Sequence, residues 1–197
     1  MPDEGAVHVI DDDVAVRQSL AFLLATAGLT VRLYETAASF LEAVERTTIG
    51  CVVTDVRMPG MDGLELLRRV KQRALALPVI VMTGHGDIPL AVQAMREGAV
   101  DFIEKPFDDE RLLNAVKSSM ARAPKIESAT NVDLEKLSER ERQVLDGVLA
   151  GKQNKVIAHD LGLSPRTVEV YRANVMTKMN ADSLPELVRK VLAAKNR

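Results

Sequence analysis

Four aspartates stand directly behind short apolar runs, where their carboxylates are placed to do chemistry together. Asp11–Asp13 are consecutive and follow the run 6–10, and Asp55 follows the run 51–54. If the two runs are neighbouring parallel strands, the carboxylates converge, and like charges that converge are costly unless a cation or a shared proton relieves them. Mg²⁺ suits this role because it prefers oxygen ligands, takes one or two carboxylates and accepts a substrate phosphate. The pattern therefore predicts a magnesium site.

Two further side chains stand at equivalent positions behind later runs. Thr83 follows the run 78–82, and Lys105 follows the run 100–103 and precedes a proline. Taken alone, Thr83 would be a turn residue and Lys105 a solvated surface lysine. A metal, an ammonium and a hydroxyl around one carboxylate instead describe a phosphoryl-accepting site, in which Asp55 is the nucleophile while the metal and Lys105 offset charge.

The elements that must position these residues alternate between strand and helix. Apolar runs, typical of strands covered on both faces, alternate with amphipathic stretches at 14–27, 63–73 and 87–97. This alternation predicts an α/β fold with one doubly wound, flavodoxin-like parallel sheet. A strand order of 2-1-3-4-5 would make the first and third strands neighbours. The five predicted strands are 6–10, 30–34, 51–54, 78–82 and 100–103.

The last third of the chain has only helical signals. Ser138 and Glu141 form a capping-box pattern that opens the first of four predicted helices. The others are expected over 154–161, over 165–179 behind the Ser164 N-cap, and over 184–194. The short second helix, the turn and the longer third helix follow helix-turn-helix order. We predict three segments: an α/β domain over 5–122, a linker over 123–133 and an all-α domain over 134–197.

Charge is distributed unevenly between the two predicted domains. Residues 1–124 contain 13 Lys and Arg against 18 Asp and Glu, whereas residues 125–197 contain 13 against 10. The basic second part favours a nucleic acid as partner. An ordinary solvated helix face is the alternative. The residues expected to contact DNA from the two motif helices are Lys152, Asn154, Lys155, Arg166, Thr167, Arg172, Asn174 and Lys178.

Composition excludes several other classes of protein. No apolar run approaches the roughly 20 residues needed to cross a bilayer, and the acidic start is unlike an export signal. The single cysteine, Cys51, cannot form an internal disulfide or a four-cysteine zinc site, which fits a reducing compartment. We expect a cytoplasmic protein without a membrane partner.

Four motifs in the first domain resemble the receiver domain of bacterial two-component response regulators. They are VIDDD at 9–13, TDVRMPGMDG at 54–63, TG at 83–84 and KPF at 105–107. The resemblance implies that a sensor histidine kinase phosphorylates Asp55 and that Mg²⁺ is held by Asp11, Asp12, Asp55 and the Arg57 backbone carbonyl. It implies that Thr83 and Lys105 contact the phosphoryl group, next to a proline bond that is often cis. It also implies a switch aromatic at Phe102, with Val92 and Arg96 beside it on a dimer face.

Three stretches of the second domain resemble the DNA-binding domain of the LuxR/NarL class. They are LSERERQVL at 137–145, GKQNKVIA at 151–158 and LSPRTVEVYR at 163–172. The resemblance implies a recognition helix over 165–178 whose groove-facing residues are Thr167, Glu169, Val170 and Ala173. Many relatives have Lys at the position of Glu169. Because Glu accepts from cytosine N4, whereas Lys donates to guanine, we expect a base preference of its own for this chain.

Together the two resemblances imply a phosphorylation-switched transcription activator. The expected partners are the kinase, double-stranded DNA, a second copy of the phosphorylated chain and RNA polymerase. The stretches TGHGDIP at 83–89 and GAVDFIEKPF at 98–107 are most similar to nitrogen-fixation regulators of rhizobia, which would place an oxygen-sensing haem kinase upstream.

Several alternatives stand beside this reading. Asp13 and Asp62 are interpreted as helix N-caps, although each could bind a metal. An enzyme using Asp55 as nucleophile, such as a haloacid-dehalogenase-like phosphatase, needs a second carboxylate two residues later, where this chain has Arg57. A phosphorylation-switched protein-interaction module without DNA binding is the third possibility.

Overall fold

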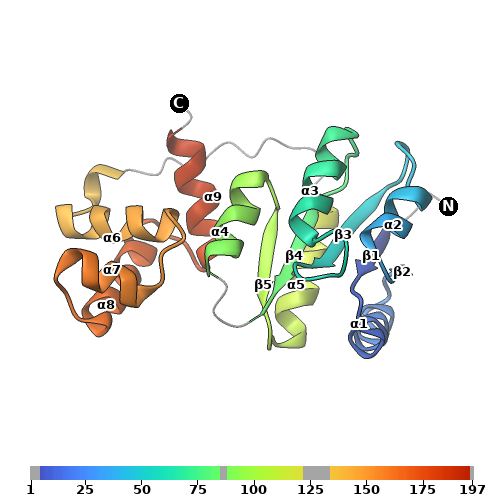
Figure 1. Cartoon of the computed structure of the whole chain (residues 1–197), viewed down its shortest axis with the longest axis horizontal. Coiled ribbons are helices and arrows are strands. Elements are labelled where there is room, and N and C mark those ends of the chain that lie inside the picture. Colours follow the sequence, from blue (N-terminus) through green and yellow to red (C-terminus); the bar gives the residue numbers. More distant parts are fainter. Residues whose placement is uncertain (1–4, 85–87, 122–133, 196–197) are drawn as a thin grey trace. The chain divides into compact units, whose positions relative to one another are not determined.

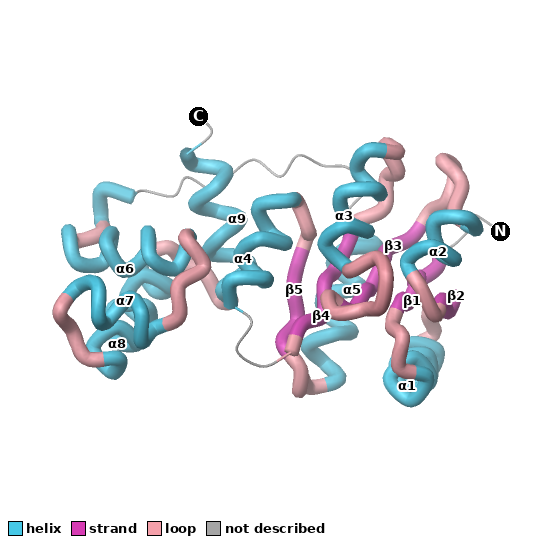
Figure 2. Tube along the Cα trace, in the orientation of Figure 1, coloured by secondary structure: helices cyan, strands magenta, loops and turns pink. Residues whose placement is uncertain are grey.

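The computed structural model describes residues 5–84, 88–121 and 134–195. Residue contacts divide the chain into two compact units, residues 1–85 with 97–125 and residues 86–96 with 126–197. Strands and helices alternate in the first unit, and the described part of the second contains only helices (Figures 1 and 2). The predicted linker 123–133 and the predicted cap Asp87 lie outside the described residues.

The first unit is built on five parallel strands in the order β2-β1-β3-β4-β5. This confirms the predicted fold class, and the order is the one that makes the first and third strands neighbours. Ile10 pairs with Thr54, and Asp55 pairs with Met82, so neighbouring strands reach the same edge of the sheet at their carboxyl ends. The strands are β1 (Ala6–Ile10), β2 (Val31–Tyr34), β3 (Gly50–Asp55), β4 (Val79–Thr83) and β5 (Asp101–Glu104).

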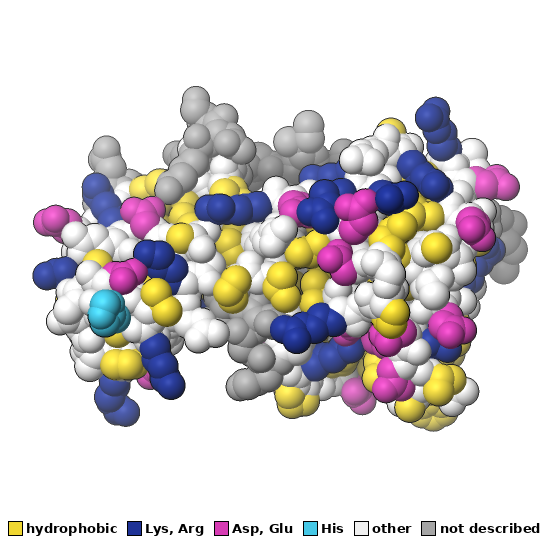
Figure 3. All heavy atoms as spheres, viewed as in Figure 1, with side chains coloured by type: hydrophobic (Ala, Val, Ile, Leu, Met, Phe, Trp, Pro, Cys, Tyr) yellow, Lys and Arg dark blue, Asp and Glu magenta, His cyan; other side chains and the backbone are white. Residues whose placement is uncertain are grey.

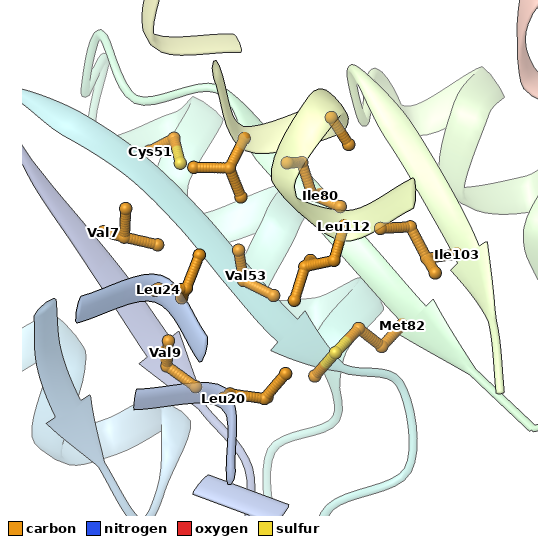
Figure 4. Packing of buried hydrophobic residues seen from close by; sticks show 12 residues of the cluster. Val7, Val9, Leu20, Leu24, Cys51, Val53, Ile80, Met82, Ile103 and Leu112 are labelled. Carbon is orange, nitrogen blue, oxygen red and sulfur yellow. The ribbon is translucent and has the colours of Figure 1, made fainter. Parts of the chain in front are cut away.

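Helices cover both faces of this sheet. On one face, α1 (Val14–Thr26) and α5 (Asp109–Ala121) pack on a core of aliphatic side chains together with Cys51 and Met82 (Figure 4). The other face carries α2 (Ala37–Ala43) and α3 (Gly63–Gln72). Helix α2 was not predicted, because seven residues are too few to display a clear helical period.

Two aspartates at the helix starts act as N-caps, as predicted. Asp13 Oδ1 accepts from the amides of Ala15 and Val16, 2.7 and 3.2 Å away. Asp62 Oδ1 accepts from the Glu65 amide at 2.7 Å. Both caps satisfy backbone donors that have no partner inside the first turn of a helix.

The second unit contains α4 (Ile88–Glu97) up to Arg96 and four helices near the carboxyl terminus of the described chain. Those four are α6 (Glu139–Leu149), α7 (Asn154–Leu161), α8 (Pro165–Lys178) and α9 (Leu184–Lys195), preceded by a short 3₁₀ turn over Leu134–Lys136. They confirm the predicted helical domain, and the Ser138–Glu141 capping box is present. A buried cluster joins α6, α7 and α8 and includes Val144, Val148, Ile157, Ala158 and Val168.

The turn of the helix-turn-helix follows its local chemistry. Gly162 ends α7 in the left-handed conformation at φ 65°, which glycine adopts without strain, and the Ser164 side chain caps α8 by accepting from the Thr167 amide. The apolar Val156 of α7 does not pack between the two helices, since it is 45% exposed. The neighbouring Ile157 faces the core instead.

In the described parts of the chain, no helix is both long and apolar enough to cross a membrane.

Candidate functional site

The carboxyl edge of the sheet brings together three residues that the sequence singled out. Lys105 Nζ donates to Asp55 Oδ1 at 2.5 Å and to Asp11 Oδ2 at 3.1 Å. Asp11 ends up here because it follows β1, Asp55 because it is the last residue of β3, and Lys105 because it follows β5. One ammonium thus joins two carboxylates that belong to neighbouring strands.

Backbone groups hold both carboxylates in place. The amide of Arg57 donates to Asp55 Oδ2 at 2.6 Å, and the amide of Asp13 donates to Asp11 Oδ1 at 2.9 Å. Arg17 of α1 donates from Nη1 to the Asp11 carbonyl at 2.6 Å. Each carboxylate therefore has one oxygen fixed by the backbone and the other oriented toward Lys105. Both aspartates are buried, and Asp55 is the more exposed of the two.

The position of Lys105 is set by the end of β4. Its amide donates to the Thr83 carbonyl at 2.7 Å, and the Lys105–Pro106 peptide bond is cis, as the resemblance implied. Burial of the Lys105 ammonium disfavours its charged form and by itself would lower its pKa. Hydrogen bonds and Coulombic attraction from Asp55 and Asp11 outweigh this and raise the pKa of Lys105. Lys105 is therefore a firmly charged partner for the two carboxylates at neutral pH.

Thr83 is the last residue of β4 and is 2% exposed. Its hydroxyl is buried and has no hydrogen-bond partner among the described residues. A buried hydroxyl without a partner is costly, and this makes Thr83 Oγ1 a candidate donor to a group bound at this edge.

The carboxylates fit a divalent cation. Asp11 and Asp55 bring two negative charges against the single positive charge of Lys105, and carboxylate oxygens are the ligands that Mg²⁺ prefers. The side chain of Asp12 is exposed, and the described residues contain no group of three or more His, Cys, Asp or Glu side chains placed to hold a metal. Two carboxylates remain sufficient because Mg²⁺ usually keeps several waters. The roles of Asp12 and of the Arg57 carbonyl stay predictions.

The three residues expected on a switch face lie in different units. Phe102 is buried in β5 of the first unit, and α4, which carries Val92 and Arg96, groups with the second. Val92 is buried and Arg96 is exposed. The dimer face built from these residues stays a prediction.

The backbone of Phe102 is held by a pair that the sequence did not reveal. The guanidinium of Arg111, on α5, donates to both carboxylate oxygens of Asp101 at 2.9 Å and to the Phe102 carbonyl at 3.1 Å. Asp101 Oδ1 also accepts from the Phe102 amide at 2.8 Å. The spacing from Asp101 to Arg111 crosses from a strand to a helix and carries no periodic signal. The sequence likewise carries no periodic signal for the contact between Arg17 and the Asp11 carbonyl.

The residues predicted to contact DNA fall into two groups on the helix-turn-helix. Side chains of the first group form ion pairs or hydrogen bonds with other residues of the same domain. Lys152 pairs with Asp160 at 2.8 Å, Arg172 donates to Asn154 Oδ1 at 2.7 Å, and Lys178 donates to Glu141 Oε2 at 2.7 Å. Burial chiefly lowers the pKa of Arg172, while nearby Glu169 opposes the shift.

The second group is available on the surface. The exposed members are Lys155, Arg166, Glu169, Val170, Ala173 and Asn174, and Thr167 is half-buried beside the Ser164 cap. Lys and Arg side chains are prominent over the C-terminal helices on the face that Figure 3 shows. The exposed members on α8 lie on the helix that was predicted to be the recognition helix, while Lys155 lies on α7.

Comparison with known proteins agrees with both parts of this description. The profile of the response regulator receiver domain matches residues 7–117, and that of the luxR family of bacterial regulatory proteins matches residues 135–191. The chain is a response regulator with a LuxR-type DNA-binding domain. Receiver domains generally bind Mg²⁺ at the phosphorylation site, and the two domains of this response regulator imply a kinase and DNA as partners.

Relatives named FixJ match this response regulator over almost its whole length. The transcriptional regulatory protein FixJ of Azorhizobium caulinodans is 57% identical over 98% of this chain and 95% of its own. The protein of the same name from Bradyrhizobium diazoefficiens is 52% identical over 98% of both chains. The crystal structure of full-length FixJ from B. japonicum matches with a TM-score of 0.59 and 52% identity, over 98% of both chains. The named relatives are transcriptional regulators.

Proposed function

We propose that phosphorylation of Asp55 by a sensor histidine kinase switches this response regulator into a DNA-binding homodimer that activates transcription. In the transfer, the phosphorus–nitrogen bond of the kinase phosphohistidine breaks and a bond to an Asp55 carboxylate oxygen forms. The observation that carries the proposal is the contact between Asp55 and Lys105 at the buried edge of the sheet. A charged ammonium held there offsets negative charge on the transferring group.

The other residues at this edge have distinct proposed roles. Asp11 and Asp55, with Asp12 and the Arg57 carbonyl, would hold Mg²⁺. When bound, that ion supplies charge stabilisation to the transferring phosphoryl group. The Thr83 hydroxyl, which has no partner among the described residues, would donate to a phosphoryl oxygen and so move toward Asp55. Phe102, which is already buried, would then change its rotamer and with it the face on which Val92 and Arg96 are expected to dimerise.

Dimerisation connects this chemistry to DNA. A shift from 1:99 to 99:1 between two states requires a differential of about 5.5 kcal/mol, so several contacts must change together. Two recognition helices related by a dimer axis would meet half-sites about 34–36 Å apart, and their combined binding adds affinity without new base contacts. We propose a cytoplasmic activator that engages RNA polymerase, and the FixJ-named relatives suggest nitrogen-fixation genes as targets.

The test is DNA binding by the full chain before and after treatment with acetyl phosphate and Mg²⁺. The probes are a duplex selected from a random-sequence pool by the treated chain and a shuffled duplex of equal composition. We expect treatment to raise affinity for the selected duplex, and we expect log affinity to fall linearly with log salt concentration. Equal affinity with and without acetyl phosphate would contradict the switch, and binding that is indifferent to salt would indicate a protein partner.

A further inference from the structure

Glu141 is the buried charged side chain of the DNA-binding helices in the part of the chain that the structure describes. It lies in the first turn of α6 and is 3% exposed. An acidic residue in this position of a helix is ordinarily solvated, and a buried carboxylate is stable only when it is paired and hydrogen-bonded. The partners of Glu141 therefore show what it does.

Both partners of the carboxylate bind the same oxygen. Glu141 Oε2 accepts from the Ser138 amide at 2.7 Å and from Lys178 Nζ at 2.7 Å. The Ser138 hydroxyl accepts from the Glu141 amide at 3.3 Å, which completes the capping box. Lys178 is the last residue of α8, so a single carboxylate oxygen links the start of α6 to the end of the recognition helix.

The electrostatics of the two helix ends favour this link. A carboxylate is stabilised near a helix N-terminus, and an ammonium is stabilised in the last turn of a helix. The hydrogen bond from Lys178 and then that from the Ser138 amide lower the pKa of Glu141, so the carboxylate remains ionised at neutral pH. A second link, from Arg172 to Asn154, joins the middle of α8 to the start of α7.

We propose that Glu141 is a positioning residue for DNA recognition, which fixes the angle of α8 by holding Lys178. The inference rests on the DNA binding proposed above. It reassigns Lys178 from a phosphate contact to an internal anchor. Loss of the link should therefore weaken discrimination between DNA sequences, because groove-facing side chains of α8 lose their register, and should leave the number of phosphate contacts unchanged.

The test compares Glu141→Gln and Lys178→Met with the control Glu139→Gln in the full chain treated with acetyl phosphate. Glu139 is the exposed neighbour on the same helix and undergoes the same change of charge. The quantity measured is the ratio of affinities for the selected and the shuffled duplex, at several salt concentrations. We expect each of the first two variants to lower this ratio about tenfold with an unchanged salt slope, and the control to leave it within about twofold.

Two outcomes would overturn the inference. If Lys178→Met weakens binding to both duplexes alike and reduces the salt slope by about one phosphate contact, Lys178 touches DNA and the inference is wrong. Unchanged ratios in both variants also overturn it. Lys178→Met decides the question even if Glu141→Gln fails to fold, because Lys178 is partly exposed. If the unmodified chain binds neither duplex, it is the proposed function that fails.

Discussion

Lys105 donates to Asp55 across 50 positions of the sequence, with Nζ only 2.5 Å from Oδ1. The same ammonium reaches Asp11, so it balances one of the two charges at the carboxyl edge of the sheet. A phosphoryl group on Asp55 would add further negative charge beside a cation that is already in place.

Replacing Lys105 should destabilise the α/β unit in a way that Mg²⁺ partly reverses. Lys105→Met leaves two buried carboxylates facing each other, and we expect the free energy of unfolding to fall by about 1–3 kcal/mol at neutral pH. Mg²⁺ should recover more stability in this variant than in the parent chain. Urea unfolding can be followed by Tyr34 fluorescence in a Tyr171→Phe background, because the chain has two tyrosines and no tryptophan.

Lys117→Met provides the matched control for this change, since Lys117 is exposed on α5. It should alter stability by less than about 0.5 kcal/mol, with or without Mg²⁺. An equal effect of the two substitutions would show that Lys105 does not neutralise the carboxylates.

Replacing Thr83 should separate stability from signalling. Thr83→Val exchanges a hydroxyl that has no partner among the described residues for a methyl group of similar size. We expect the free energy of unfolding to stay the same or rise by up to about 1 kcal/mol, while dimer formation after acetyl phosphate treatment is lost. Thr83→Ser should retain the response. Size-exclusion chromatography with light scattering measures the dimer, and a clear loss of stability in Thr83→Val would contradict the assignment.

The free energy of unfolding of the α/β unit should fall at acid pH, because buried His8 must take up a proton. Burial in the first place, and then the charge of Arg32, lower the pKa of His8 from 6.5 to about 4. The unfolded chain therefore binds a proton below pH 6.5 that the folded chain does not bind until about pH 4. The stabilisation by neutral His8 is present above pH 6.5 and is lost as the pH falls toward 4. We expect a loss of about 2 kcal/mol between pH 7 and pH 5.

His8→Leu should remove this part of the pH dependence, and His159→Gln is the control. His8 stacks on Tyr34 and packs edge-to-face against Phe40, with ring centroids 5.8 and 5.5 Å away, whereas the side chain of His159 is 91% exposed. Unfolding by urea at the two pH values gives the comparison. If His8→Leu keeps the full slope, another group is responsible.

Exposed basic residues of the helix-turn-helix should set the salt dependence of DNA binding. Arg166→Ala and Lys155→Ala should each weaken binding to all sequences about equally, and each should reduce the salt slope by about 0.9. Arg140→Ala is the control, because Arg140 is exposed on α6 outside the predicted DNA-contacting face. Fluorescence anisotropy over a range of salt concentrations measures the slopes. A slope reduced as much by Arg140→Ala would place the DNA elsewhere.

Much of the fold was predictable because its signals are local. The apolar runs and the caps Asp13, Asp62 and Ser164 act within a few residues, and the structure confirms them. The parallel sheet then follows from the alternation of strands and helices, whereas the strand order 2-1-3-4-5 entered the prediction only as a condition. Because parallel strands end at the same edge of the sheet, the sequence also predicts that Asp11, Asp55 and Lys105 lie close together, as they do.

What the sequence could not reveal depends on side chains that meet across elements. The capping box indicates that Glu141 faces Ser138, but nothing in the spacing shows that its carboxylate also holds Lys178, 37 positions away. The basic pattern of the motif helices likewise cannot distinguish Arg166, which is exposed, from Arg172, which bonds to Asn154. The helical period shows which side chains share one face of a helix. Which residue each of them contacts depends on the tertiary packing.

The most direct test of the account is the intact mass of the full chain after exposure to acetyl phosphate and Mg²⁺. The unmodified chain should gain the mass of one phosphoryl group, and Asp55→Asn, which cannot form the acyl phosphate, should gain none. Asp13→Asn, at an exposed helix cap, should be labelled like the unmodified chain. Equal labelling of the parent chain and Asp55→Asn would contradict the assignment of Asp55 as the phosphoryl acceptor.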